Sequence, residues 1–416
     1  MPISLDRDVH SYSPGDIIPK TEKRLLENVD LNFNGDSTQH ATHSLHPYVA
    51  AINPPLARKL IDTYVPAKGK VLDPFCGGGG VLIESLLSGR DCAGFDINPL
   101  AIMIAKAKTT WIDFLRIKGE YLRIQCRAKE VFGEAKPLVS DAALFWYKPE
   151  NAIELAALSL AVSECQEEDL KNLFSVIFSY TARSVMLTYR GEVRLRKLTG
   201  KDYDKFSPNS FSIFENKYLE VLRDVPELPK KNIARVELAN ILKLPLENNS
   251  YHSVICSPPY ADDTNGVGYF QFSKYMLEWL GMAPDTIMDH KRQFLGGEKN
   301  GKTLPPSATL YISGANLLEK KPELYKDLVA FYSDYVQGLS EMKRTITNWI
   351  IIIIGNRVLG RTVFDNANIT IELFGAIGGV HLHDYYQRVI TKKRMPNLGS
   401  DGGGINVEHI LIFKKS

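Results

Sequence analysis

Two short segments, far apart in the chain, each follow an apolar run that predicts a buried strand. The run 70–72 precedes the glycine-rich segment 73–80, and the run 251–256 precedes Ser257-Pro258-Pro259-Tyr260. Glycines between a strand and a helix let the backbone approach a ligand closely and aim N–H groups at it. Open α/β sheets bind their ligands at the carboxyl ends of strands. The pair therefore predicts an α/β chain with a ligand site where these two strands end.

The surroundings of the glycine-rich segment favour a nucleotide-like ligand. A predicted helix over 81–87 and a predicted strand over 92–96 follow it, and the strand ends at Asp96. An acid about twenty residues after such a loop suits a ribose contact. A dinucleotide fingerprint needs a third glycine, which here would fall on Leu82 or Ile83, so that spacing fails. Asp73 can accept a hydrogen bond from an ammonium group. The alternative is a purely structural turn.

The Pro258-Pro259 turn presents acceptors with few competing donors. Two prolines fix φ twice and remove two N–H groups. An amine would find the Ser257 hydroxyl and the Pro258 carbonyl as acceptors, and Tyr260 offers a flat face for stacking. These are the requirements of a base flipped out of a duplex. The alternative is a rigid turn that ends a strand.

Composition limits the class of protein. The 416 residues include 44% hydrophobic and 24% charged residues, and the net charge is +2, so a nucleic-acid surface must come from local clusters. Five scattered cysteines form no Cys-x-x-Cys pair, and no Cys/His cluster has zinc spacing, so we expect no metal. The polar segment 1–28 lacks a signal-peptide core, and no apolar run could span a membrane. We expect a cytoplasmic protein.

The chain divides by its patterns into an arm, a catalytic domain and an insertion. Residues 1–44 are polar and turn-rich and predict an N-terminal arm, ordered on contact. The α/β pattern occupies 45–110 and 232–416, where five isoleucines at 350–354 predict a central strand and 283–322 predicts a polar loop. Residues 111–231 show helical periodicity and then a basic stretch, which predicts a helical insertion.

At these residues the chain resembles the S-adenosylmethionine (SAM)-dependent DNA amino-methyltransferases of the N4-cytosine/N6-adenine kind. Asp73-Pro74-Phe75-x-Gly77-x-Gly79 resembles their cofactor motif, and Ser257-Pro258-Pro259-Tyr260 resembles their catalytic motif, in the form more typical of N4-cytosine enzymes. The resemblance implies a Rossmann-like methyltransferase sheet with SAM as cofactor. It also implies double-stranded DNA as partner, with target recognition in the insertion 111–231, and a possible cognate restriction endonuclease.

The resemblance assigns roles to residues by position. The implied catalytic residues are Ser257, Pro258, Pro259 and Tyr260. The implied cofactor-binding residues are Tyr48, Asp73, Pro74, Phe75, Gly77, Gly79, Asp96, Ile97 and Asn240. Asn240 stands where the family usually has an Asp that contacts the cofactor adenine. The basic candidates for DNA binding are Arg190, Arg194, Arg196, Lys197, Lys392 and Arg394, for which the alternative is a solvated charged face.

The implied function is site-specific methylation of the N4 amine of cytosine in a flipped-out base, as in restriction-modification methylases. Carbon-5 cytosine methylation needs a Pro-Cys nucleophile, and the sequence contains no Pro-Cys dipeptide. N6-adenine methylation remains an alternative because Ser can replace Asp at position 257. A tRNA guanine-N2 methyltransferase is less favoured, since only about forty-five residues precede the family-like region. A catalytically silent DNA-binding module is the alternative outside the enzymes.

Overall fold

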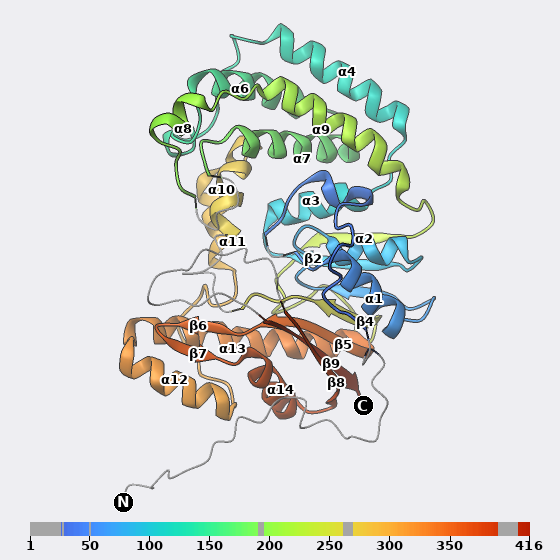
Figure 1. The fold of residues 1–416 in the computed structure, drawn as a ribbon, viewed down its shortest axis with the longest axis vertical. Helices are drawn as coiled ribbons and strands as arrows, with labels where there is room; N and C mark the ends of the chain where they lie inside the picture. The colour runs from blue at the N-terminus through green and yellow to red at the C-terminus, as the bar shows by residue number, and fades with distance from the viewer. Residues whose placement is uncertain (1–25, 27–28, 50, 190–194, 261–268, 390–406) are drawn as a thin grey trace, which may run out of the picture.

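The computed structural model describes residues 26, 29–49, 51–189, 195–260, 269–389 and 407–416, and its centre is a seven-stranded sheet in the order β3-β2-β1-β4-β5-β9-β8 (Figure 1). Strands β1 to β5 are mutually parallel, whereas β9 runs antiparallel to both β5 and β8. The strands are β1 (Val71–Asp73), β2 (Cys92–Asp96), β3 (Ala234–Leu238), β4 (Tyr251–Cys256), β5 (Ile346–Gly355), β8 (Val380–Val389) and β9 (Val407–Lys415). The predicted Rossmann-like α/β sheet is confirmed.

The sheet is buried on both faces, and the isoleucine run shows why. Strand β5 pairs with β4 on one side and β9 on the other, and alternate side chains of a strand point to opposite faces. Ile350, Ile352 and Ile354 pack with helices α13 (Pro322–Thr345) and α14 (Asn366–Ile377). Ile351 and Ile353 belong to the core on the opposite face, with α1 (Pro54–Tyr64) and α2 (Gly80–Leu87). Continuous apolar character suits a strand covered on both faces.

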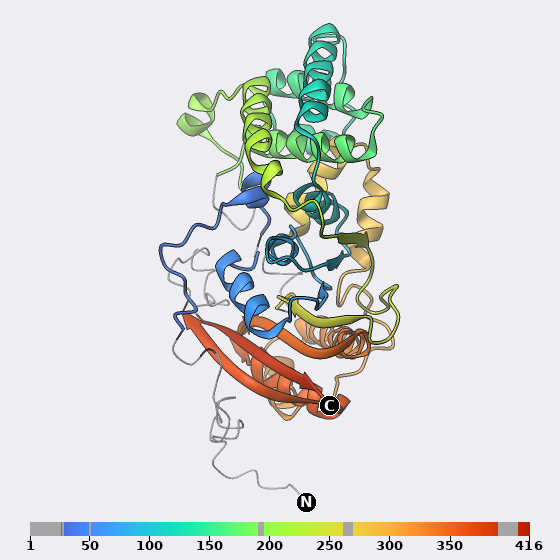
Figure 2. The ribbon, with the colours of Figure 1, turned by 90° about the vertical axis from the view of Figure 1, so that its right-hand side faces the viewer.

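A separate helical layer follows β2 and packs around its own core (Figure 2). Phe174, Ile177 and Phe178 of α7 lie at its centre and are fully buried. Helix α10 comes from the segment after β4 but joins this layer, where Trp279 contacts Phe178. The helices of the layer are α3 (Pro99–Thr109), α4 (Phe114–Glu130), α5 (Asp141–Leu144), α6 (Pro149–Ser163), α7 (Glu168–Val185), α8 (Gly200–Lys205), α9 (Ser210–Asp224), η3 (Val225–Glu227), α10 (Tyr269–Trp279) and α11 (Pro284–Arg292).

The structure corrects the predicted polar loop over 283–322, which contains α11 and α12 (Ala308–Lys320). Their apolar faces are narrow: Ile287 is the buried side chain of α11, and Leu310 and Leu317 face the core from α12. Because polar residues occupy the remaining faces of both helices, the helical repeat of apolar residues is hard to recognise in the sequence. A hairpin of β6 (Arg357–Leu359) and β7 (Thr362–Phe364) was also not predicted.

The last part of the predicted N-terminal arm contributes buried structure. The short 3₁₀ helix η2 (Ala41–Leu45) buries Ala41, Thr42 and Leu45, and the Leu26 N–H donates to the Tyr386 hydroxyl at 3.0 Å. The segment leading to α1 therefore lies against the body of the protein. None of the helices within the described residues has the length and apolar character needed to cross a membrane.

Candidate functional site

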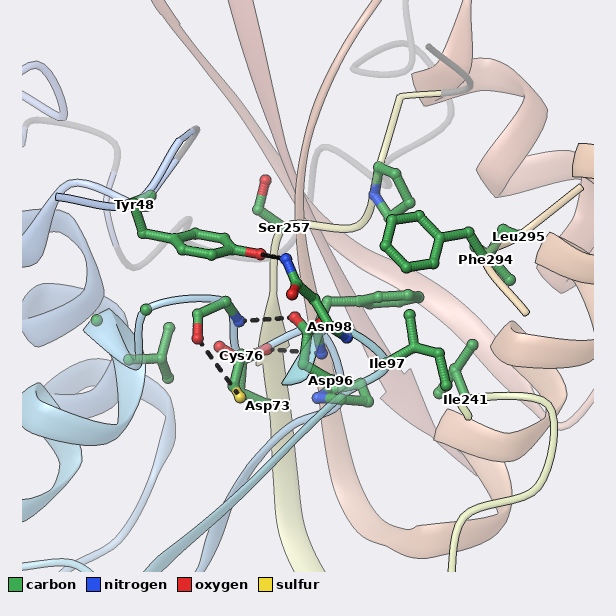
Figure 3. A pocket seen from close by; sticks show the side chains of 18 of the residues that line it. Tyr48, Asp73, Cys76, Asp96, Ile97, Asn98, Ile241, Ser257, Phe294 and Leu295 are labelled. Carbon is green, nitrogen blue, oxygen red and sulfur yellow. Dashed lines mark hydrogen bonds between the residues drawn. The ribbon is translucent and has the colours of Figure 1, made fainter. Parts of the chain in front are cut away.

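A pocket opens at the point where the strand order reverses. Strands β1 and β4 are neighbours, yet the chain continues from β1 toward β2 and from β4 toward β5, on opposite sides. Such a switch point is where open α/β sheets bind ligands. The pocket is lined by residues at the carboxyl ends of β1, β2 and β4, among them Asp73, Asp96 and Ser257 (Figure 3). The two sequence segments that defined the prediction thus meet at one cavity.

The glycine loop lies directly beneath the Tyr48 ring. A Cβ on Gly77 would come within 2.8 Å of that ring, and one on Gly78 would come within 2.7 Å of the Tyr48 Cβ atom. Gly77 also has a φ of +47°, which L-residues rarely adopt. Gly79, predicted to bind cofactor, instead faces Ala105 of α3 at 3.1 Å and does not line the pocket. Gly77 and Gly78 form the cradle, and Gly79 permits close helix packing.

Asp73 is a buried carboxylate at the base of the pocket. Its side chain is 2% exposed and accepts one hydrogen bond from the Phe75 N–H at 3.1 Å. Burial raises the pKa of Asp73 to about 8, the Phe75 N–H lowers it, and the nearby Asp96 raises it further. No described cation is among the groups that act on this carboxyl. A ligand ammonium would supply the missing positive charge.

Asp96 and Asn98 brace the loop from β2. The Asp96 carboxylate accepts from the Gly77 N–H at 2.9 Å and from the Asn98 N–H at 2.8 Å. Burial raises the pKa of Asp96 to about 6, and these N–H groups oppose the rise. The Asn98 amide donates to the Tyr48 hydroxyl at 3.1 Å (Figure 3). It also donates to the hydroxyl of Ser273 of α10 at 2.8 Å. Sequence reasoning missed Asn98; its place two residues after Asp96 was the available signal.

An apolar wall faces the two acids across the pocket. Ile97, Ile241, Phe294 and Leu295 line it, and Figure 3 shows them together on one side. Phe294 and Leu295 were missed because they fall in the stretch predicted as a polar loop. Asn240 lines the pocket, but its side chain is engaged: the Oδ1 atom accepts from the Leu242 N–H at 3.0 Å, and the amide donates to the Gln293 carbonyl at 3.1 Å.

The Pro-Pro turn closes the pocket above β4. The hydroxyls of Ser257 and Tyr260 lie 3.2 Å apart, and Ser257 and Pro259 line the cavity. Buried Asn366, at the start of α14, donates to the Gly355 carbonyl at 2.8 Å and to the Tyr260 carbonyl at 3.5 Å. This asparagine, also missed from the sequence, ties the turn to the end of β5.

The predicted basic residues are only partly placed. Arg190, Arg194, Lys392 and Arg394 lie outside the described residues. Arg196 stacks on Tyr189 with its guanidinium 3.9 Å from the ring centroid, and the Lys197 ammonium lies 3.4 Å from that of Phe145. The adjoining Leu195 N–H donates to Gln271 of α10 at 3.4 Å. This segment thus lies against the helix whose Ser273 contacts the pocket residue Asn98.

The pocket fits SAM by its chemistry. The uncompensated carboxylate of Asp73 matches the ammonium of the methionine part, and the Gly77-Gly78 backbone allows close approach. The Asp96 carboxylate has lone pairs left for ribose hydroxyls, since an ionised carboxylate offers about four acceptor sites. The wall of Ile97, Ile241, Phe294 and Leu295 suits a planar adenine.

Comparisons with known proteins agree with this chemistry. A family model described as DNA methylase matches residues 9–107. The Type II methyltransferase M.MvaI of Kocuria varians is 28% identical over 98% of both chains. The Type II methyltransferase M.MjaII of Methanocaldococcus jannaschii is 26% identical over 46% of this chain and 29% of its own length. A solved SAM-dependent methyltransferase from Methanosarcina mazei covers 86% of this chain and 96% of its own, at 10% identity and a TM-score of 0.31, too low to bear on function.

Proposed function

We propose that this chain, which belongs to the SAM-dependent DNA amino-methyltransferases, methylates the N4 amine of cytosine within a specific DNA sequence. The observation that supports this most strongly is the Ser257–Tyr260 turn, which follows the carboxyl end of β4 and lies at the pocket whose chemistry fits SAM. Serine at its first position resembles the N4-cytosine form of the family motif. We further propose that the target cytosine is flipped out of the duplex and that the enzyme acts in a restriction-modification system.

The turn acts on the amine by accepting its hydrogens. An exocyclic amine is a weak nucleophile because its lone pair is delocalised into the ring. The Ser257 hydroxyl and the Pro258 carbonyl would hold the two N–H groups out of the ring plane and so localise the lone pair. The hydrogen bond between the Ser257 and Tyr260 hydroxyls leaves the serine oxygen a lone pair, whichever hydroxyl donates. These acceptors also stabilise positive charge that develops on the nitrogen.

When bound, SAM supplies an electrophilic methyl group on a sulfonium. Asp73, the Gly77-Gly78 cradle and Asp96 would hold it, with Tyr48 fixed over the cradle by Asn98. The fixed loop and turn hold their ligands in one geometry, and positioning of this kind contributes much of an enzyme's rate. No covalent intermediate on the protein is needed. The buried thiol of Cys256 lies on β4 before the turn, and burial raises its pKa well above the usual range, which keeps it uncharged.

The modified base can be identified directly. Plasmid DNA incubated with the protein and SAM would be digested to nucleosides for mass spectrometry and, in parallel, mapped at single-base resolution. We expect N4-methylcytosine at one recurrent sequence and no modified base with heat-inactivated protein. N6-methyladenine in its place would contradict the assignment to cytosine while leaving amino methylation intact. If a parallel incubation with transfer RNA gives methylated guanine while the DNA stays unmodified, the proposed DNA substrate is contradicted.

The basic segment beside α10 provides a prediction about DNA affinity. A double replacement, Arg196→Ala with Lys197→Ala, is expected to weaken binding of duplex DNA. The negative slope of the logarithm of the association constant against the logarithm of the salt concentration should become less steep by about one to two, because each phosphate contact contributes about 0.9. Fluorescence anisotropy at several salt concentrations would measure both quantities. Lys326→Ala, on the exposed side of α13 far from this segment, is the matched control. An unchanged slope would show that these two cations contact no phosphate.

A further inference from the structure

Two histidines and a glutamate meet where η2 packs against α2, outside the set of residues that line the described pocket. The Nε2 atoms of His40 and His43 lie 2.8 and 2.7 Å from the same oxygen, Oε1 of Glu84. The candidate ligand atoms of the three residues all lie within 4.8 Å of one another. None of the three lines the cofactor pocket, and the proposed methyl transfer uses none of them.

The local backbone explains why the two rings converge. His40 is the N-cap of the 3₁₀ helix η2 and His43 lies within it. In such a helix, side chains three residues apart are eclipsed. The ring centroids are accordingly 4.9 Å apart, with the ring planes at 61°. The helix therefore presents two imidazoles on one side, toward α2.

Glu84 completes the cluster from α2. It is 1% exposed, and an isolated buried carboxylate is costly unless it is paired or bound to a metal. The Arg58 Nε–H donates to its other oxygen, Oε2, at 2.8 Å. That contact fixes the carboxylate and leaves Oε1 facing the two imidazoles. The positive charge of Arg58 also compensates part of the negative charge of the Glu84 carboxylate.

The hydrogen bonds of His40 place a lone pair in the cluster. Its Nδ1 atom lies 3.3 Å from the Ser37 carbonyl, which can only accept, so Nδ1 holds the proton. In a neutral imidazole the Nε2 atom then has a lone pair, and this lone pair points at Glu84. A cation must lie between this nitrogen and the carboxylate oxygen 2.8 Å away, and it is either the proton of an imidazolium or a metal ion. An Nδ1–H bound to a backbone carbonyl is also the usual outer contact of a metal-ligating histidine.

We propose that His40, His43 and Glu84 bind a Zn²⁺ ion, with water as the fourth ligand. Imidazole nitrogen and carboxylate oxygen are common zinc ligands, and two histidines with one glutamate form a known ligand set. Bonds of about 2.0–2.1 Å in a tetrahedral site place ligand atoms about 3.3 Å apart. Each imidazole ring therefore needs to move away from Oε1 of Glu84 by only about 0.5 Å. Local spacing could not reveal the site, because Glu84 lies 44 residues after His40.

The ion would fasten the N-terminal segment to the cofactor domain. It would link η2 to α2, and α2 begins at Gly80, next to the Gly77-Gly78 cradle. Lys108 of α3 reinforces the same junction, since its ammonium donates to the His43 carbonyl at 3.0 Å. The role of the metal is therefore structural, and the proposal is independent of which base the enzyme methylates.

Zinc binding can be measured on the full chain without reference to activity. Protein stripped with a chelator would be titrated with Zn²⁺ in competition with a chromophoric chelator. We expect one tightly bound ion per chain in the wild type and loss of that ion in His40→Ala and in His43→Ala. Two controls should still bind it: His381→Ala, which removes an exposed histidine elsewhere, and Cys126→Ser, which removes the exposed thiol.

Thermal unfolding and cobalt spectra guard against a variant that merely misfolds. Added Zn²⁺ should raise the melting temperature of the wild type and of His381→Ala but not of His40→Ala, whose side chain is 36% exposed and tolerates removal. The Co²⁺-loaded wild type should show the strong visible absorption of a tetrahedral site. Absence of a stoichiometric ion, retention of the ion by both histidine variants, or an octahedral Co²⁺ spectrum would overturn the proposal.

Discussion

Replacement of Tyr260 by alanine is expected to lower the rate of methyl transfer at least about 100-fold while SAM affinity changes less than about threefold. Loss of an aromatic stacking face costs about 1–3 kcal/mol per base. The variant also removes the hydroxyl 3.2 Å from that of Ser257, which we propose accepts from the target amine. A 100-fold loss of rate corresponds to about 2.7 kcal/mol, within the reach of these two effects together.

Two companion variants separate the ring from the hydroxyl. Tyr260→Phe keeps the stacking face and should lose no more than about tenfold, the equivalent of one ordinary hydrogen bond. Ser257→Ala removes the proposed acceptor, and its rate of methyl transfer should be close to that of Tyr260→Ala. Single-turnover transfer of radiolabelled methyl to duplex DNA measures the rate, and equilibrium dialysis measures SAM binding. Normal turnover by either Tyr260→Ala or Ser257→Ala would refute the assigned role of the turn.

The parts of the site that sequence reasoning found are those built from consecutive residues. Asp73, the glycine loop, Asp96 and the Ser257–Tyr260 turn each follow a strand whose apolar run is visible in the sequence, and parallel strands bring their carboxyl ends together. The fold class followed from the order of strand, glycine loop, helix, strand and acid over 71–96, and the isoleucines of β5 suit a strand buried on both faces.

The parts that were missed depend on packing between distant segments. Phe294 and Leu295 reach the pocket from a stretch whose helices have one or two buried side chains each, too few to show a period. Asn98 and Asn366 act through amides that donate to the Tyr48 hydroxyl and to the Tyr260 carbonyl, partners that lie 50 and 106 residues away in the sequence. Helix α10 follows the Ser257–Tyr260 turn in sequence yet packs on the helical layer, because Trp279 completes that core.

Replacement of Asp73 by asparagine is expected to raise the stability of the SAM-free protein and to weaken SAM binding at least about 100-fold. The pKa of this carboxyl is about 8 in the folded protein, against an ordinary value of 3.8. The folded state therefore holds a proton that the unfolded state releases above pH 3.8, so Asp73 increasingly destabilises the fold as pH rises from about 4 to about 8. Asparagine removes that penalty and can still accept from the Phe75 N–H.

The same pKa gives cofactor binding a pH dependence. Pairing with the SAM ammonium requires ionised Asp73, so below pH 8 binding releases a proton and the affinity should rise by up to tenfold per pH unit between pH 6 and 7.5. Calorimetry in buffers of different ionisation enthalpy would count the proton, and thermal melts at pH 5 and pH 8 would follow stability. Asp62→Asn, half exposed on α1, is the control and should leave the affinity and its pH dependence unchanged. Tight, pH-independent binding by Asp73→Asn would show that the ammonium is held elsewhere.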